Sequence, residues 1–352
     1  MDYETRREAA KAVGPLPAGH PQVKTGKVGV LLVTLGTPDG TDFKPMWRYL
    51  REFLSDKRVI ELPRAIWYPI LYGIVLTVRP KKSGANYARI WNRERDESPL
   101  RTYTRGQAEK LAVALADLPQ VAVEWGMRYG NPSTESAVQR LKDQGCERIL
   151  ALPLYPQYSA TTTATANDQL FRALMKMRHA PAVRTAPPYH DEPAYIDALA
   201  ASVTQHLATL DFEPELVLAS YHGIPKAYFE KGDPYHCHCV KTTRLLREKL
   251  GWDDKRLITT FQSRFGAQEW LQPYTEPTLE KLAQEGVKSV AVINPGFSVD
   301  CIETLDEIGR EAAHAFHEAG GEKFSHIPCL NDSVEGMAVI ETLVRRELRG
   351  WV

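Results

Sequence analysis

The sequence predicts an α/β fold of two similar domains, each with a parallel sheet flanked by helices. Two apolar runs, at residues 27–38 and 216–221, are continuous, which is typical of strands buried on both faces. Segments of strand and helix character alternate through both halves, as parallel strands joined by crossover helices require. The chain has 352 residues, which exceeds one ordinary core and suits two domains.

The first half begins with Lys27-Val-Gly-Val-Leu-Leu-Val-Thr-Leu-Gly-Thr-Pro38, a strand that ends at a turn signal. A loop and then a helix are expected over residues 39–54. The other elements predicted for this half are strands ending at residues 124–130 and 148–155, and helices over residues 135–144 and 163–178.

The second half repeats this alternation. Residues 30–38 resemble residues 217–225, so the two halves are interpreted as related Rossmann-like domains that face one another across a cleft. The predicted elements are strands at residues 216–221, 256–262 and 289–294, and helices at residues 242–250, 278–285, 300–319 and 333–348. We assign residues 27–186 to an N-terminal domain and residues 187–352 to a C-terminal domain, with a proline-containing hinge near residues 185–193.

Residues 1–26 are expected to form an N-terminal extension, with a short helix and a lead-in that contains proline and glycine. They contain no apolar core, so they do not form a secretory signal, and their acidic residues argue against a transit peptide. The five cysteines are odd in number, which with no secretory signal favours a reducing compartment over a disulfide framework. The expected location is the cytoplasm.

Charge and motif content exclude several functional classes. Lys plus Arg and Asp plus Glu both number 44, so no net basic field argues for a nucleic-acid partner. No G-x-G-x-x-G or Walker pattern follows a strand, which leaves no nucleotide site. No G-x-S-x-G elbow and no H-E-x-x-H zinc motif occurs.

Residues 65–78 form an uncharged apolar run that is too short to span a bilayer, which takes about 20 residues. Aromatic residues within it and basic residues on both flanks favour an exposed lip in peripheral contact with a membrane surface. The alternative is a core helix beneath a loop.

His222 ends the strand at residues 216–221, where Gly223 and Pro225 prevent its continuation. The carboxyl ends of parallel strands are where ligands bind, and a histidine there suits proton transfer or metal binding. From these residues alone, a structural histidine that is hydrogen-bonded to the backbone is as well supported as a functional one.

Glu303, Glu307 and Glu311 recur every four residues and share one face of a predicted helix. Like charges at this spacing destabilise an isolated helix. A track of carboxylates that passes protons or a hard cation is one explanation, and a solvated acidic face is the other. Glu303 lies near the helix start and is expected to face His222 across the cleft.

His236-Cys-His-Cys239 is the densest cluster of soft metal ligands in the chain. Cys237 and Cys239 project to the same side only if this segment is extended. A closed zinc or iron–sulfur site also requires two further ligands.

The stretch Leu218-Ala-Ser-Tyr-His-Gly-Ile-Pro225, followed by Lys231-Gly-Asp-Pro-Tyr235, resembles the signature of ferrochelatases. These enzymes insert ferrous iron into protoporphyrin IX in the last step of haem synthesis. The similarity extends from residue 27 to the C-terminus and implies the two-domain chelatase fold with a porphyrin cleft between the domains. Other segments that resemble the family, in order, are Leu35-Gly-Thr-Pro, Phe53-Leu-Ser-Asp, Met127-Arg-Tyr-Gly, Leu154-Tyr-Pro-Gln-Tyr-Ser, Gln262-Ser-Arg-Phe-Gly, Glu269-Trp-Leu-Gln-Pro and Asp300-Cys-Ile-Glu-Thr-Leu.

The resemblance implies roles for individual residues. His222 matches the histidine that accepts pyrrole protons or helps to bind iron, and Glu303 matches the carboxylate opposite it. Glu307 and Glu311 match the acidic track that follows. The residues that match the lining of the porphyrin cleft are Leu35, Arg128, Tyr129, Tyr155, Trp270 and Phe297, with Lys57 or Arg58 near a propionate. The lip matches a segment that contacts the bilayer in membrane-associated relatives.

Two departures bear on substrate and cofactor. Leu35 stands where some relatives that use coproporphyrin have tyrosine, which favours protoporphyrin IX. The cluster-binding cysteines of animal enzymes have no counterpart here, and one of those positions is Ala160. Some bacterial relatives bind a [2Fe–2S] cluster through other cysteines, and the candidate set here is Cys146, Cys237, Cys239 and Cys329, with Cys301 as the spare.

The sequence therefore predicts a protoporphyrin ferrochelatase that uses Fe²⁺ as substrate, acts as a monomer or homodimer, and is cytoplasmic with peripheral contact at the inner membrane. One alternative is a chelatase for another porphyrin, such as coproporphyrin, or for another metal. An alternative of a different class is a two-domain solute-binding protein, against which the acidic helix and the missing secretory signal argue.

Overall fold

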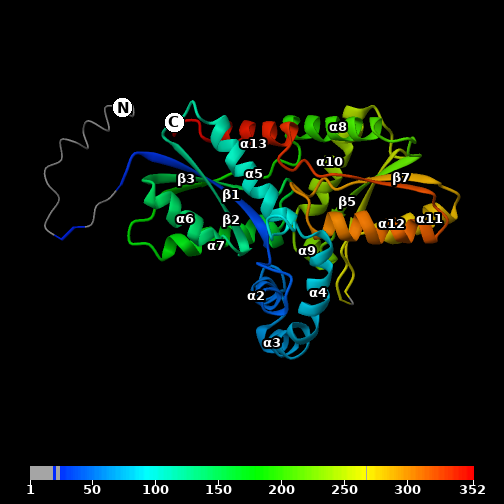
Figure 1. The fold of residues 1–352 in the computed structure, drawn as a ribbon, viewed down its shortest axis with the longest axis horizontal. Coiled ribbons are helices and arrows are strands. Elements are labelled where there is room, and N and C mark those ends of the chain that lie inside the picture. Colours follow the sequence, from blue (N-terminus) through cyan, green and yellow to red (C-terminus); the bar gives the residue numbers. More distant parts are fainter. Residues whose placement is uncertain (1–18, 21–23, 267) are drawn as a thin grey trace.

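The computed structural model describes residues 19–20, 24–266 and 268–352, so the helix predicted in the N-terminal extension lies outside the described residues. Two four-stranded sheets, in which all the paired strands are parallel, form the framework of the chain. Helices lie against both sheets (Figure 1). The predicted α/β architecture with two similar halves is confirmed.

The strands follow the same order in both sheets, β2-β1-β3-β4 in the first and β6-β5-β7-β8 in the second. This shared order explains the weak similarity between the two halves of the sequence. The strands are β1 (Lys27–Thr37), β2 (Val121–Gly130), β3 (Cys146–Pro153), β4 (Ala182–Thr185), β5 (Leu216–His222), β6 (Leu257–Gln262), β7 (Ser289–Ile293) and β8 (Lys323–Ile327).

β1 and β5 occupy inner positions in their sheets, which is why their sequences are continuously apolar. Nine of the eleven residues of β1 and six of the seven in β5 are buried. The edge strands β4 and β8 were not predicted, because most of their residues are exposed or only partly buried and they contain no continuous apolar run.

Helices cover the sheets and connect their strands. Those of the lip region (α3, η1 and α4) and three others, α5, α8 and α9, were not predicted as helices. The helices are α2 (Phe43–Leu54), α3 (Arg64–Ile70), η1 (Leu71–Val75), α4 (Leu76–Ile90), α5 (Pro99–Ala114), α6 (Thr134–Asp143), η2 (Ala160–Ala164), α7 (Thr165–Met175), α8 (Pro193–Ala208), α9 (Lys226–Glu230), α10 (Tyr235–Leu250), α11 (Thr275–Gln284), η3 (Glu303–Ala312), α12 (Ala313–Glu318) and α13 (Val334–Glu347), where η marks a π-helix.

The two halves share one apolar core. It contains buried residues of β1, such as Leu32, and of β5, such as Val217, together with residues of α8 and α13. The C-terminal helix α13 packs against α5 of the first half as well as against α8, as Figure 1 shows along the upper edge. The predicted domain boundary at residues 186 and 187 falls between β4 and α8 and stays a prediction.

The carboxyl ends of β1 and β2 meet at a glycine. Gly36 has a φ of +115°, and a Cβ atom at this position would lie 1.8 Å from the carbonyl oxygen of Tyr129. Only glycine permits this close approach and this backbone conformation. The contact fixes the end of β2, which carries Arg128 and Tyr129, against the end of β1, which carries Leu35.

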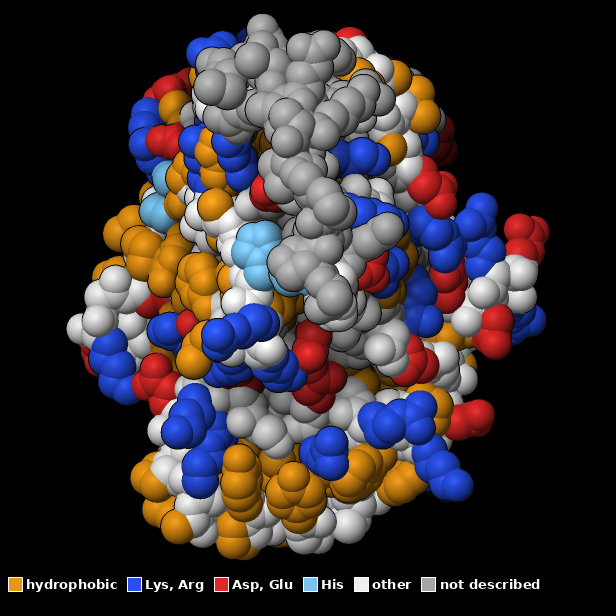
Figure 2. Space-filling view, turned by 90° about the vertical axis from the view of Figure 1, so that its left-hand side faces the viewer, with side chains coloured by type: hydrophobic (Ala, Val, Ile, Leu, Met, Phe, Trp, Pro, Cys, Tyr) orange, Lys and Arg blue, Asp and Glu red, His pale blue; other side chains and the backbone are white. Residues whose placement is uncertain are grey.

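The helices α3, η1 and α4 form an arm that projects below the two sheets (Figure 1), and the lip, residues 65–78, makes up the first half of this arm. Apolar side chains are exposed along it, including Ile66 at 56%, Ile74 at 62% and Val78 at 68%. Figure 2 shows apolar side chains gathered at this foot of the molecule, with Lys and Arg side chains in a row above them. The prediction of an exposed lip is confirmed, although Trp67 is buried and donates a hydrogen bond of 2.7 Å to Leu54 O.

No helix among the described residues has both the length and the apolar character that a bilayer crossing requires.

Candidate active site

His222 is the last residue of β5, and β5 lies between β6 and β7. Its Nδ1 is 2.6 Å from the carbonyl oxygen of Gly223, so Nδ1–H is donated there and Nε2 keeps its lone pair. The ring centroid of Trp270 is 6.4 Å from that of the histidine, whose side chain is partly exposed. The backbone therefore holds His222 in a tautomer in which Nε2 can act as a base.

Glu303 and Glu307 lie on the first turns of η3, where backbone hydrogen bonds span five residues. This wide helical geometry is rare and occurs frequently at functional sites. Two residues at the end of β6 hold it in place: Gln262 Nε2 donates a 2.8 Å bond to Glu303 O, and Ser263 Oγ donates a 2.6 Å bond to Glu307 Oε2. The end of the neighbouring strand thus binds the backbone of Glu303 and the carboxylate of Glu307.

Burial raises the pKa of Glu307, and the negative charge of Glu303 adds to this rise. The hydrogen bond from Ser263 and the electrostatic effect of His222 act in the opposite direction. Because His222 and Glu303 both act on Glu307 electrostatically, the structure brings these three predicted residues into one group.

Neutral groups surround Glu303. Burial raises the pKa values of Tyr49, Tyr87 and the Cys301 thiol, and the charge of Glu303 adds to each rise. The two tyrosine rings meet edge to face, with centroids 6.5 Å apart. Glu303 therefore lies beside hydrogen-bonding groups that stay protonated at neutral pH. The two tyrosines were missed from the sequence, because they come from α2 and α4 and no motif marks them.

Glu311 is not part of this group. Its side chain is half exposed, lies 2.6 Å from Arg310 Nη2, and is near Glu276 of α11. The acidic residue that is buried on η3 is Asp306, which forms ion pairs with Arg310 and with Arg89 of α4. The predicted three-residue ladder is thus two residues long at the candidate site, because the third carboxylate faces solvent and a cation on its own helix.

No three His, Cys, Asp or Glu side chains in the described part of the chain lie close enough together to hold a metal ion. His222, Glu303 and Glu307 are therefore neighbours without forming a complete coordination sphere. In the observed arrangement, a cation contacts at most two of them at once.

Apolar residues predicted to line the cleft lie around these carboxylates. Leu35 and Ile302 pack against the same apolar cluster, and Phe297 packs against the cluster that contains Cys301. Trp270 lies beside His222, as described above. Tyr155 is partly buried against the core of the first sheet, and its hydroxyl is buried with no hydrogen-bond partner in the described structure.

Comparison with known proteins decides the family. The sequence model of the family described as ferrochelatase matches residues 27–348, which is most of the chain. The chain belongs to the ferrochelatase family. It is therefore an enzyme of haem biosynthesis that inserts iron into a porphyrin, and iron is its substrate.

Relatives match along nearly the whole length. The ferrochelatase of Mesorhizobium japonicum is 76% identical over 345 residues, which cover 98% of each chain. The ferrochelatase of Chelativorans sp. is 67% identical and covers 99% of this chain and 98% of its own. The ferrochelatase of Agrobacterium fabrum is 66% identical and covers 97% and 100%.

Solved structures show the same chelatase fold. SirB from Bacillus subtilis with Fe³⁺ superposes with a TM-score of 0.57 at 12% identity, covering 92% of this chain and 97% of that one. The sirohydrochlorin chelatase SirB in complex with cobalt gives a TM-score of 0.51 at 12% identity with the same coverage. At this identity the likeness concerns the fold alone.

Arg128 and Tyr129 are engaged in a buried network in this ferrochelatase chain. Arg128 forms an ion pair with Asp56 and donates a 2.6 Å hydrogen bond to Thr165 Oγ1. Tyr129 is fully buried and donates a 2.8 Å bond to the same Asp56 carboxylate. Their predicted contact with porphyrin stays a prediction, and the hydrogen-bonding groups seen here are directed at the protein.

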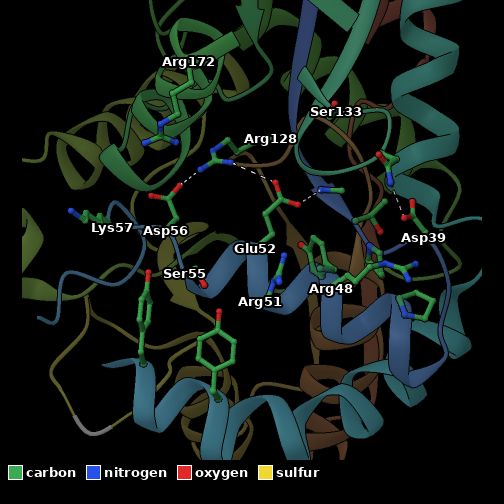
Figure 3. Close-up of a pocket in the computed structure, with 18 of the residues that line it drawn as sticks. Asp39, Arg48, Arg51, Glu52, Ser55, Asp56, Lys57, Arg128, Ser133 and Arg172 are labelled. Atoms are coloured by element: carbon green, nitrogen blue, oxygen red, sulfur yellow. Dashed lines mark hydrogen bonds and ion pairs between the residues drawn. The ribbon is translucent and has the colours of Figure 1, made fainter. Parts of the chain in front are cut away.

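Lys57 and Arg58, predicted near a propionate, differ in their partners. Arg58 forms a hydrogen-bonded ion pair with Asp168 at 2.9 Å. Lys57 is exposed, forms no ion pair with any described residue, and points outward in Figure 3. Of the two, Lys57 is the cation that is available to an anionic group.

The structure does not assemble the predicted iron–sulfur ligands. Cys237 and Cys239 lie on α10, where a spacing of two residues directs side chains to different sides, so Cys237 is exposed and Cys239 is buried. The sequence argument required an extended segment, which this is not. Burial also raises the pKa of Cys239 well above its usual value, which opposes the thiolate that a cluster needs.

The other two candidates lie elsewhere. Cys146 begins β3 and packs in the core of the first sheet, where burial raises the pKa of its thiol to about 11. Cys329 follows β8 and lies near Asp300 and Cys301, the thiol left as the spare. Because no three of these groups converge among the described residues, the donor set does not fit a [2Fe–2S] cluster.

A polar network behind the carboxylates was missed from the sequence. Gln262 Oε1 accepts hydrogen bonds from Ser220 Oγ at 2.7 Å and from Asn294 Nδ2 at 2.8 Å. Asn294 Oδ1 is in turn 3.0 Å from His326 Nε2. The available signal was that Ser220, Gln262 and Asn294 are polar residues at or just beyond the ends of three adjacent strands.

Proposed function

We propose that this enzyme inserts Fe²⁺ into protoporphyrin IX, with His222 Nε2 accepting the pyrrole protons and Glu303 and Glu307 receiving the iron. The arrangement that supports this most strongly is the grouping of an imidazole, whose Nδ1–H is bound to backbone, with Glu303 and Glu307, whose backbone carbonyl and carboxylate respectively accept hydrogen bonds from the end of β6. The base and the cation ligands thus approach one substrate from neighbouring elements.

Proton balance requires such a group. A free porphyrin carries two central N–H protons, and both leave as Fe²⁺ binds the four nitrogens. Nε2 of His222 takes one proton at a time and returns it to solvent. Glu307, whose pKa burial raises, is placed to exchange protons with the imidazole. Binding energy from the walls of the cleft is available to distort the flat ring and expose its nitrogens.

The surroundings of Leu35 favour protoporphyrin IX over coproporphyrin. Leu35 packs with Phe53 and Ile302 against an apolar cluster. A vinyl group of protoporphyrin IX can be buried against this cluster. A propionate of coproporphyrin at the same place would lose its hydration without gaining a cation as partner. Competition between the two porphyrins in one assay tests the choice: we expect protoporphyrin to be preferred by wild type, and Leu35→Tyr to reduce that preference.

The assignment of His222 is tested by His222→Ala. We expect iron insertion to fall by about 10²–10⁴-fold, which is the usual contribution of a general base. Porphyrin binding, followed by fluorescence quenching, should persist. His314→Ala is the matched control, because His314 is 70% exposed and lies 3.3 Å from Glu318, away from the candidate site. Retained turnover in His222→Ala would falsify the assignment.

We further propose that the lip contacts a membrane peripherally and that the enzyme works from the cytoplasmic side. Six large apolar side chains on the lip are more than a third exposed, which is typical of an interfacial surface. The substitutions Ile74→Ser and Val78→Ser should weaken co-sedimentation with phosphatidylcholine vesicles. Unchanged sedimentation of the double variant would count against the contact.

We propose that no iron–sulfur cluster takes part in turnover, because the four candidate cysteines do not converge. An absorption spectrum of the purified enzyme tests this directly. Bands of a [2Fe–2S] cluster would contradict the assignment, and bands of bound porphyrin would support the proposed substrate class.

A further inference from the structure

A cavity of about 710 Å³ lies between α2, the start of the lip and the ends of β1 and β2. None of His222, Glu303 and Glu307 lines it, but Tyr49, Lys57 and Arg128 do, so the cavity adjoins the candidate active site without containing its base or its carboxylates. Figure 3 shows Arg51 and Glu52 projecting from α2 into this space. Its size is in the range of sites that hold small organic molecules.

The lining is strongly cationic. Six basic residues and three acidic residues line the cavity: Arg48, Arg51, Lys57, Arg64, Arg128 and Arg172, with Asp39, Glu52 and Asp56. The basic excess lies within one cavity, in a chain whose formal net charge is zero. The field inside the cavity therefore attracts anions.

The carboxylates of the lining already have partners. Asp39 is 2.7 Å from Arg101, outside the cavity lining, and Asp56 pairs with Arg128. Glu52 accepts a 3.0 Å hydrogen bond from the amide of Gly130. Its Oε1 also lies 3.9 Å from Arg128 Nη1, so the ion pairs that the lining carboxylates form with described residues are with Arg101 and Arg128 and not with Arg48, Arg51 or Arg64.

Arg172 lies 4.0 Å from Asp168, outside the lining, whereas other donors of the lining have no acceptor among the described residues. Nη1 and Nη2 of Arg64 are both buried, and neither finds a hydrogen-bond acceptor among the described residues. Ser55 Oγ, in the same lining, is also buried without a partner. Arg48 and Arg51 form no ion pair in the described part of the chain, and Arg51 only stacks over Trp47 at 5.2 Å. Buried donors, and above all charged ones, are costly unless an acceptor meets them.

We propose that this cavity binds the phosphate group of an organic phosphate, with Arg64 and Ser55 as direct hydrogen-bond donors. A planar guanidinium with two free Nη groups matches two phosphate oxygens, and the hydroxyl supplies a third bond. The volume exceeds what a phosphate alone fills and suits one carried on a larger group. Tyr68 and Tyr72 of the lip close the cavity below and offer it an apolar wall.

Two sources present this chemistry, a soluble phosphate ester and a phospholipid headgroup. The lip makes the headgroup accessible, since exposed Ile74 and Val78 continue the same arm. Calorimetric titration with glycerol 3-phosphate tests the soluble source. Sedimentation with vesicles of phosphatidylcholine, against an equal mixture of phosphatidylcholine and phosphatidylglycerol, tests the lipid source.

Arg64→Gln removes the charged donors, and Lys81→Gln is the control, because Lys81 is an exposed cation of α4 that does not line the cavity. We expect Arg64→Gln to weaken phosphate binding by about 20-fold or more, as expected for lost charge-assisted bonds. The control should leave glycerol 3-phosphate binding unchanged and weaken binding to the mixed vesicles by no more than about fivefold, the diffuse effect of one cation. Ser55→Ala, which removes one neutral donor, should weaken binding by about threefold to tenfold.

Saturable glycerol 3-phosphate binding that only the cavity variants weaken supports a soluble ester. Binding confined to the mixed vesicles, with the same dependence on Arg64, supports a headgroup. Equal losses in Arg64→Gln and Lys81→Gln, or equal sedimentation with both kinds of vesicle and no titration signal, overturn the proposal. Thermal unfolding of each variant identifies a loss of fold, in which case Ser55→Ala alone decides the outcome.

Discussion

The hydroxyl of Ser263 donates a 2.6 Å hydrogen bond to Glu307, and Ser263 does so from a left-handed backbone conformation with φ of +66°. A non-glycine residue in this region is strained by about 1–2 kcal/mol, and such strain is concentrated at functional sites. The strained serine therefore links the end of β6 to the candidate carboxylate, and its conformation is explained by the bond that it makes.

Ser263→Ala and Ser263→Gly separate the bond from the strain. Both variants lose a hydrogen bond that lowers the pKa of Glu307, so that pKa should rise and the acidic limb of the pH–rate profile should move to higher pH. Only the glycine variant also relieves strain, and it should be more stable than the alanine variant by about 1 kcal/mol in urea unfolding. An unmoved acidic limb in both variants would show that the hydroxyl does not tune Glu307.

Glu307→Gln and Glu311→Gln form a matched pair on η3. The raised pKa of Glu307 means that its contribution to stability is present while it is protonated and is lost as the pH rises through its folded-state pKa. Glu307→Gln should therefore unfold at higher urea than wild type at pH 8, with the difference shrinking towards pH 4, while iron insertion falls steeply. Glu311→Gln should change the free energy of unfolding by less than about 0.5 kcal/mol, because the Glu311 side chain is half exposed beside Arg310.

These two variants also test the length of the acidic track. Kinetics with iron as the varied substrate should show a large loss for Glu307→Gln and less than about a tenfold loss for Glu311→Gln. Equal losses in the two variants would show that Glu311 acts on iron together with Glu303 and Glu307, as the four-residue spacing in the sequence suggests.

The fold was predictable where the chain carries its own signal. The apolar runs of β1 and β5 show that these strands are buried on both faces, and the shared strand order follows from their similarity. The edge strands β4 and β8 carry no such signal, because half-exposed strands of four or five residues are defined by their neighbours. The four-residue spacing of the glutamates predicted a shared face but not the π-helix that presents it.

The site was predictable where one motif supplies the chemistry, as with His222, Glu303 and Glu307. What the sequence could not show is pairing between distant segments. Arg128 matched a substrate-lining position, yet its guanidinium meets Asp56, 72 residues away along the chain. Local patterns give residue types and strand ends, while the partner of a charged group depends on how the elements pack.

The Arg128–Asp56 pair should be important for stability. Both side chains are nearly buried, with 6% and 3% exposed, and Thr165 and Tyr129 donate to the same carboxylate. Asp56→Asn should lower the free energy of unfolding by about 3–5 kcal/mol, because it removes the nearer counter-charge of a buried guanidinium and leaves only Glu52, which is 3.9 Å away and 44% exposed. Asp168→Asn is the control, since its pair with Arg58 is partly exposed and should contribute about 0–1 kcal/mol. Similar losses in the two variants would contradict the importance of burial.

His190 should make the fold sensitive to acid. Its ring stacks on that of His238 with centroids 3.6 Å apart, and only 11% of its side chain is exposed. Burial, followed by the charge of His238, lowers the pKa of His190 to about 4 from 6.5, against the opposing effect of Asp191. His190 therefore binds a proton more tightly in the unfolded chain than in the folded one. The contribution of neutral His190 to the free energy of unfolding is present above pH 6.5 and is lost as the pH falls towards 4.

Because of this pKa shift, His190 should lower the free energy of unfolding of the wild type by about 2 kcal/mol between pH 7 and pH 5. His190→Phe keeps an aromatic ring on His238 but cannot titrate, so its urea midpoint should change less over the same interval. His314→Ala, which alters a 70% exposed histidine, should keep the dependence of the wild type. If His190→Phe is as sensitive to acid as the wild type, the stacked pair is not the source, and the buried carboxylates around η3 become the next groups to vary.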